Sequence, residues 1–229
     1  MVIMTIHQPY VEVIRQALSR ESDSERAKGQ AAYMRDQFEF FGLTAGERRI
    51  ILAPFLQKSA LPTKLEVIDL IPKLWKEPQR EFQYFGQELF GKYKRHLELS
   101  DIPVLEFMIS HKSWWDTVDY IAAHLVGAVL SKYPDSRSGC CDTWFDSGNI
   151  WLQRTTLLFQ LKYKSELDQD LLRKQIDRLT GSQEFFIRKA IGWILREYSK
   201  TNPNWVRQFV SDRPELSNLS RREALRLIH

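Results

Sequence analysis

One carboxylate in the sequence occupies a helix position where an apolar side chain is expected. Asp119 follows Trp115 by four residues, which places both on one face of a helix. Ala122 and Val126 fall beside it, so Asp119 lies at the edge of an apolar stripe. A charge at such a position must be paired or it will be neutralised. Two interpretations follow: a structural ion pair with an arginine, or a functional carboxylate held beside an indole at a cleft.

A second group of candidate residues surrounds Trp193. Lys189 precedes this tryptophan by four residues and Arg196 follows it by three, so one helix face carries an indole between two cations. Tryptophans on helices are most often core residues, but the flanking cations indicate a surface that faces an anion. Arg154, near the start of another helical segment, could reach a phosphate or pair with an acid. The sequence leaves both roles of Arg154 open.

Helix-start signals indicate which elements carry these residues. Capping boxes are predicted at Thr44–Glu47, Thr63–Glu66 and Ser220–Glu223, and single caps at Ser113, Asn149 and Asn202. Between these signals apolar residues recur every three or four positions, as in helices, without convincing alternation typical of strands. Glycine and proline are sparse, with 10 and 9 residues, which also favours helices over a turn-rich β fold. We therefore predict an all-α fold.

Helix-opening segments recur at steps of roughly 33 to 38 residues, the length of a two-helix unit of the HEAT or TPR kind. The positions in register are Arg49, Gln83, Asp116, Arg154, Lys189 and Glu223. We predict a right-handed solenoid of about six HEAT-like repeats with a concave groove, because such units bury their apolar faces only by stacking. It would form a single domain over residues 1–229; an irregular helical bundle is the alternative. The second helix of each unit would place on the concave face the side chains of Trp115, Asp119, Arg154, Lys189, Trp193 and Arg196.

Composition narrows the classes of partner and ligand. The net charge of +4 is compatible with a phosphate-binding surface but does not require one. The only cysteines, Cys140 and Cys141, are adjacent, and the five histidines are scattered, so neither a disulfide framework nor a metal site is predicted. No signal peptide and no apolar run of membrane-spanning length are visible. We expect a cytoplasmic protein without metal or cofactor, and we assign the two cysteines no role.

Three longer motifs lie in the segments that carry the candidate residues. They read SWWDTVD at 113–119, NIWLQR at 149–154 with LFQLKYK at 158–164, and EFFI at 184–187 with KAIGW at 189–193 and LREY at 195–198. In order and spacing they resemble the signatures of the AlkD family of bacterial alkylpurine DNA glycosylases. The resemblance runs from about Arg26 almost to the C-terminus.

The resemblance implies a function for the predicted groove. The family is a solenoid of HEAT-like repeats that binds duplex DNA and excises cationic purines alkylated at ring nitrogen three or seven, leaving an abasic site without flipping the base. By similarity Asp119 is the catalytic carboxylate, Trp115 and Trp193 contact the deoxyribose of the lesion, and Arg154 contacts the DNA backbone. The expected partner is double-stranded DNA with alkylated bases, and we expect the protein to be a monomer.

Four further residues are expected at the DNA. Lys189 and Arg196 provide cations beside Trp193, and Tyr33 matches a family tyrosine near the duplex. Thr44 departs from the pattern, because it stands where the family carries a glutamine that reaches the duplex. Two alternatives remain, a non-catalytic DNA-binding relative and a HEAT-repeat scaffold for protein partners. Neither explains why Asp119 occurs together with both tryptophans.

Overall fold

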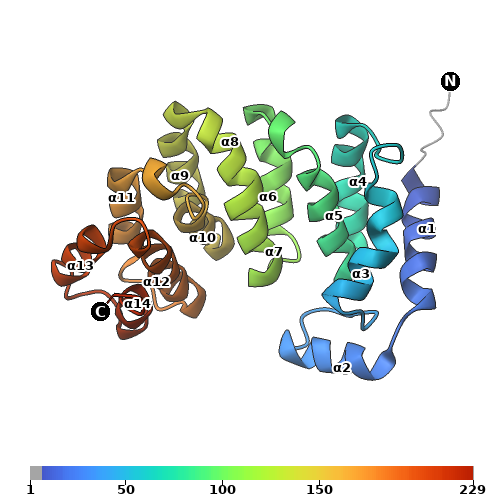
Figure 1. Ribbon diagram of the computed structural model, residues 1–229, viewed down its shortest axis with the longest axis horizontal. Helices are drawn as coiled ribbons and strands as arrows, with labels where there is room; N and C mark the ends of the chain where they lie inside the picture. The colour runs from blue at the N-terminus through green and yellow to red at the C-terminus, as the bar shows by residue number, and fades with distance from the viewer. Residues whose placement is uncertain (1–6, 229) are drawn as a thin grey trace. The chain divides into compact units, whose positions relative to one another are not determined.

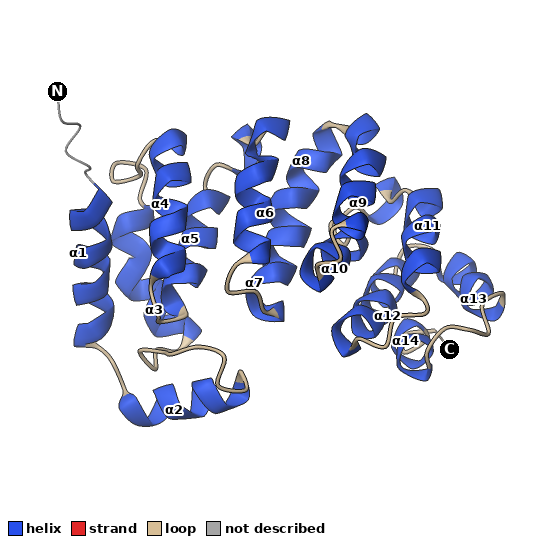
Figure 2. Cartoon of the chain, turned by 180° about the vertical axis from the view of Figure 1, so that it is seen from behind, coloured by secondary structure: helices blue, strands red, loops and turns tan. Residues whose placement is uncertain are grey.

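The computed structural model describes residues 7–228, and within that range every regular element is a helix (Figures 1 and 2). The prediction of an all-α fold is confirmed over these residues. None of the described helices is both long enough and apolar enough to cross a lipid bilayer.

The contacts between helices divide the chain into two compact units, Met1–Arg95 and His96–His229. The first unit contains α1 (His7–Arg20), α2 (Ser24–Tyr33), α3 (Ala45–Leu52), α4 (Lys64–Lys76) and α5 (Glu81–Gly91). Its core lies between α4 and α5, which pack against each other, with α1 against α3 and α4. Fully buried side chains include Leu70 and Leu74 of α4 and Phe82, Phe85 and Leu89 of α5.

The first α-helix of the second unit is α6 (Ile102–Ser110), which is followed by one long helical segment. That segment comprises α7 (Trp115–Tyr120), a π-helix (Ile121–Val126) and α8 (Gly127–Lys132). The remaining helices are α9 (Arg137–Asp146), α10 (Ile150–Leu158), α11 (Gln169–Leu179), α12 (Phe185–Ser199), α13 (Pro203–Ser211) and α14 (Asn218–Ala224). α10 packs on α6, α7, α9 and α12, and α12 packs in turn on α13 and α14.

Contacts in the second unit recur at the repeat length predicted from the sequence. The side chains of Arg154 and Asp119 are hydrogen-bonded across 35 residues, and those of Lys189 and Glu223 across 34. The Tyr163 hydroxyl donates to the Gly127 carbonyl across 36 residues. These contacts join equivalent positions of successive helix pairs, as in a helical repeat. The HEAT type, the number and hand of the repeats, and the single domain stay predictions.

Most of the predicted helix starts are confirmed. Thr44 and Thr63 each form a capping box with the glutamate three residues later. The side chain of Asn149 caps α10 by accepting from the backbone amides of Trp151 and Leu152. Asn202 caps α13 by accepting from the amide of Trp205. These starts were predictable because each cap is formed within a few residues of the chain.

Two predicted caps are wrong, because the side chains make other hydrogen bonds. The N-cap of α7 is Trp114, and the Ser113 hydroxyl donates instead to the Ile109 carbonyl at the end of α6. Ser220 lies inside α14, whose cap is Ser217. The carboxylate of Glu223, expected to close a capping box with Ser220, binds side chains of α12.

Candidate functional site

A pocket of about 320 Å³ lies among α7, α10 and α12 of the second unit. Its lining consists of Trp115, Asp119, Arg154, Phe185, Phe186, Lys189, Trp193 and Arg196. All six side chains that the repeat pattern placed on one face therefore line one cavity. α7, α10 and α12 are the second helices of successive pairs, and α10 packs on both α7 and α12, which brings these residues together.

Asp119 and Arg154 form a two-pronged ion pair in the wall of the pocket. Arg154 Nε lies 2.7 Å from Asp119 Oδ1, and Arg154 Nη2 lies 2.8 Å from Asp119 Oδ2. The Nη1 group of Arg154 donates to the carbonyl of Phe186 at the start of α12. The side chain of Arg154 is 3% exposed and that of Asp119 is 13% exposed. The ion pair considered from the sequence is thus present, and the paired carboxylate still borders the open pocket.

The electrostatic environment of Asp119 combines two opposing effects. Burial raises the pKa of this carboxyl group, the Arg154 guanidinium counteracts the rise, and Asp116 adds to it. The resulting pKa lies above the ordinary value for an aspartate. A group with a shifted pKa in a concave, partly apolar site is a candidate for chemistry.

The helix that carries Asp119 changes its winding immediately after this residue. α7 ends at Tyr120 and is followed by the π-helix Ile121–Val126. π-Helical turns are rare and occur frequently at functional sites. The spacing of Trp115, Asp119, Ala122 and Val126 predicts an uninterrupted α-helix, which is wrong from Ile121 onward, because the residue pattern gives no signal for a π-helix.

One face of α12 also lines the pocket. Trp193 is partly buried and packs against the core of the second unit while lining the pocket. Lys189 Nζ lies 2.7 Å from Glu223 Oε1, and Arg196 Nη1 donates to Glu223 Oε2. Hydrogen bonding from Lys189 lowers the pKa of Glu223. Both cations predicted beside Trp193 are therefore present, and they are joined through the carboxylate of Glu223, which was predicted to form a capping box instead.

Two phenylalanines of the EFFI motif, for which no role was predicted, also line the pocket. Phe186 packs against Trp114 and Trp151, with ring centroids 5.0 and 4.9 Å apart. Phe185 lines the pocket and is exposed. The exposure of Phe185 follows from the packing of α12, so the residue pattern carries no signal for its place in the pocket.

The other two residues expected at DNA belong to the first unit. Tyr33 is the last residue of α2 and its side chain is 70% exposed. Thr44 is exposed and accepts from the Glu47 amide as the cap of α3. DNA contacts by Tyr33 and Thr44 stay predictions.

Two cysteine thiols lie outside the pocket. Cys140 and Cys141 are free thiols on α9, and burial raises the pKa of Cys141 to about 12, which makes it a poor nucleophile. Over residues 7–228 no group of histidine, cysteine, aspartate and glutamate side chains could hold a metal ion.

Comparison with known proteins places the chain in a family. A family model described as "DNA alkylation repair enzyme" matches residues 14–228. A solved structure, a "Predicted DNA alkylation repair enzyme from Enterococcus faecalis", is 32% identical with a TM-score of 0.83, covering 90% of this chain and 96% of that one. A search of curated proteins finds no significant match. The chain therefore belongs to the DNA alkylation repair enzyme family.

Proposed function

We propose that the protein is a monofunctional DNA glycosylase of the AlkD kind. It hydrolyses the N-glycosidic bond of purines alkylated at ring nitrogen three or seven in duplex DNA and leaves an abasic site. The observation that carries the proposal is the convergence of Asp119, Trp115 and Trp193 on one pocket.

The chemistry needs a negative charge at the sugar. Breaking an N-glycosidic bond builds positive charge on the deoxyribose, as in the oxocarbenium-like transition states of glycosidases. At an effective dielectric constant of ~20, opposite charges ~4 Å apart attract by roughly 4 kcal/mol. If Asp119 makes this interaction only in the transition state, it accelerates the reaction about a thousandfold. Asp119 would also orient the attacking water.

The ion pair with Arg154 supports the electrostatic role of Asp119, because it fixes the orientation of the carboxylate. Two hydrogen bonds fix both oxygens of Asp119 before any substrate arrives. A charge that is already oriented loses little free energy to reorganisation during the reaction. A phosphate contact of Arg154 would have to compete with Asp119 and with the Phe186 carbonyl for the same guanidinium.

The indoles provide a second source of stabilisation. Trp115 and Trp193 line the same pocket as the carboxylate. An aromatic face beside a desolvated cation contributes on the order of 1 to 2 kcal/mol. Contact with the deoxyribose, rather than enclosure of the base, agrees with excision without base flipping.

The leaving group explains why a single carboxylate suffices. A cationic alkylpurine leaves as a neutral base, so no general acid is required and undamaged purines are poor substrates. Lys189, the lysine in the pocket, is bound to Glu223. An ammonium group held in this way is not a nucleophile, so we expect no Schiff base and no strand cleavage.

The proposal is tested by base release from duplexes that hold one guanine methylated at ring nitrogen seven. We expect the wild type to release methylguanine, leave unmodified guanine in place, and yield strand breaks only after alkali treatment. Equal release by wild type and Asp119→Asn would overturn the assignment of Asp119. DNA binding without any base release would instead indicate a non-catalytic DNA-binding protein.

A further inference from the structure

The C-terminal helix α14 is fixed closely against α12. A Cβ atom on Gly192 would lie 2.5 Å from the Glu223 Cβ and 2.9 Å from the Ser220 carbonyl oxygen, so only glycine permits this approach. The Ser220 hydroxyl also donates to the Arg188 carbonyl at 2.8 Å. The position of Glu223 relative to α12 is therefore set by backbone packing as well as by its own ion pairs.

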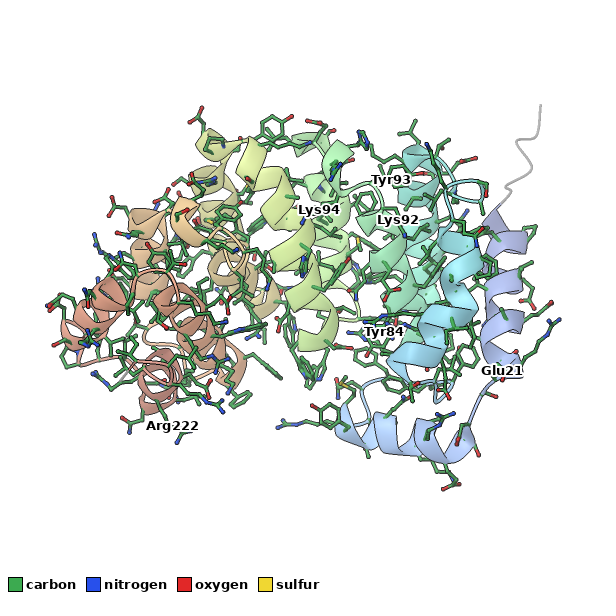
Figure 3. The ribbon with its side chains drawn as sticks, viewed as in Figure 1. Glu21, Tyr84, Lys92, Tyr93, Lys94 and Arg222 are labelled. Atoms are coloured by element: carbon green, nitrogen blue, oxygen red, sulfur yellow. The ribbon has the colours of Figure 1, made fainter. Side chains whose placement is uncertain are left out.

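The Glu223 carboxylate lies between the two cations of the pocket wall. Its side chain is 10% exposed, whereas those of Lys189 and Arg196 are 37% and 21% exposed. Arg222, its neighbour on α14, is exposed to solvent (Figure 3). Of the two neighbours on α14, Glu223 is therefore the buried one, and its carboxylate contacts both cations of the pocket wall.

Without this carboxylate, α12 would present two uncompensated cations beside Trp193. The proposed substrate base is a cation, and the proposed transition state carries positive charge on the sugar. Two unpaired positive charges in the wall would repel the cationic base and destabilise the positive charge on the sugar, whereas they would attract the DNA phosphates. Like charges repel each other more strongly where water is partly excluded.

We infer that Glu223 is a positioning residue that holds Lys189 and Arg196 in the pocket wall and offsets their charge, so that the pocket accepts a cationic base. The inference rests on the proposed glycosylase function. It assigns to α14 a part in substrate selection, although Glu223 itself does not line the pocket.

The chain offers a matched control for this carboxylate. Asp142 on α9 also binds two cations, with Lys174 Nζ at 2.9 Å and Arg178 Nη1 at 2.6 Å. None of these three residues lines the candidate pocket. Asp142→Asn changes the net charge by the same amount as Glu223→Gln.

The experiment compares Glu223→Gln, Glu223→Asp and Asp142→Asn with the wild type. The first readout is the single-turnover release of methylguanine from the methylated duplex; the second is the salt dependence of binding to an undamaged duplex. We expect Glu223→Gln to slow release about tenfold, equivalent to about 1.4 kcal/mol, while binding becomes tighter and its salt dependence steeper. Glu223→Asp should recover most of the rate, and Asp142→Asn should match the wild type in both measurements.

A merely structural role would have a different signature. If Glu223→Gln lowers release and binding together, or changes neither, the inference is overturned. Since the binding readout does not need catalysis, the two proposals fail separately. If the wild type releases no base, the proposed function fails. A steeper salt dependence of DNA binding by Glu223→Gln would still support the inference that Glu223 holds Lys189 and Arg196. An unchanged salt dependence would overturn that inference.

Discussion

Each of the two helical units buries a carboxylate whose pKa is raised by burial, Glu81 in the first and Asp119 in the second. Glu81 is 1% exposed and accepts from the backbone amide of Phe41 at 3.0 Å, which attaches the segment before α3 to α5. Asp119 is bound by a side chain, Arg154, and borders an open pocket with aromatic walls. Burial and a raised pKa therefore do not identify a functional carboxylate; access from a pocket distinguishes the two.

The difference between Asp119 and Glu81 is tested most strongly by replacing each carboxylate with the amide of the same shape. Asp119→Asn should reduce single-turnover base release about a thousandfold, because it removes the charge that opposes the developing cation. Glu81→Gln should leave the rate unchanged. If Glu81→Gln lost most of the excision rate while its melting temperature stayed unchanged, Glu81 would have to count as a functional carboxylate like Asp119.

Truncating the structural carboxylate should affect stability instead. Glu81→Ala leaves the backbone amide of Phe41 without its buried acceptor, which costs about 1–3 kcal/mol of unfolding free energy. Denaturant unfolding measures this loss. The excision rate of the fraction that remains folded should equal that of the wild type, and a rate that fell in parallel would show that Glu81 also supports the site.

The aromatic walls should contribute less than the carboxylate. Trp115→Ala and Trp193→Ala should each slow release about tenfold, as expected from roughly 1–2 kcal/mol of cation–π stabilisation. Trp205→Ala is the control, because Trp205 packs against the same core and stacks on Phe209 without lining the pocket. Similar losses in all three variants would mean that the indoles act through packing alone.

The smallest effect should appear in the dependence of the rate on pH. The reaction needs ionised Asp119, so the rate should fall as the pH drops through a pKa above the ordinary aspartate value. Arg154 favours the ionised form, and Arg154→Gln should therefore move the acid limb of the profile to higher pH. An unmoved limb, accompanied by a shallower salt dependence of binding, would instead favour the phosphate contact of Arg154.

Local signals and repeat spacing made much of the site predictable. Helical spacing alone placed Asp119 beside Trp115, and the repeat length brought Arg154, Lys189 and Trp193 to the same face. Caps such as Asn149 were predictable because the side chain and the amides that it binds lie within three residues.

The remaining features depend on contacts between helices that are distant in sequence. Glu223 fits a capping box with Ser220 by spacing, yet α14 packs closely on α12 at Gly192 and the carboxylate of Glu223 binds side chains of α12. Whether Arg154 pairs with an acid or reaches a phosphate could not be decided from its neighbours along the chain. The π-helix after Tyr120 likewise leaves no mark in the pattern of residue types.

That π-helix keeps the two ends of one long helical segment in register although the segment carries an extra residue. A π turn accommodates about one residue more than an α turn. If Ile121–Val126 wound as α-helix with all its residues present, α7 would rotate by about 100° relative to α8. Trp115 and Asp119 would then turn away from α12, although each would keep its place in the sequence of α7. Deleting one residue within Ile121–Val126 should instead let the segment rewind as α-helix with Trp115 and Asp119 still facing the pocket.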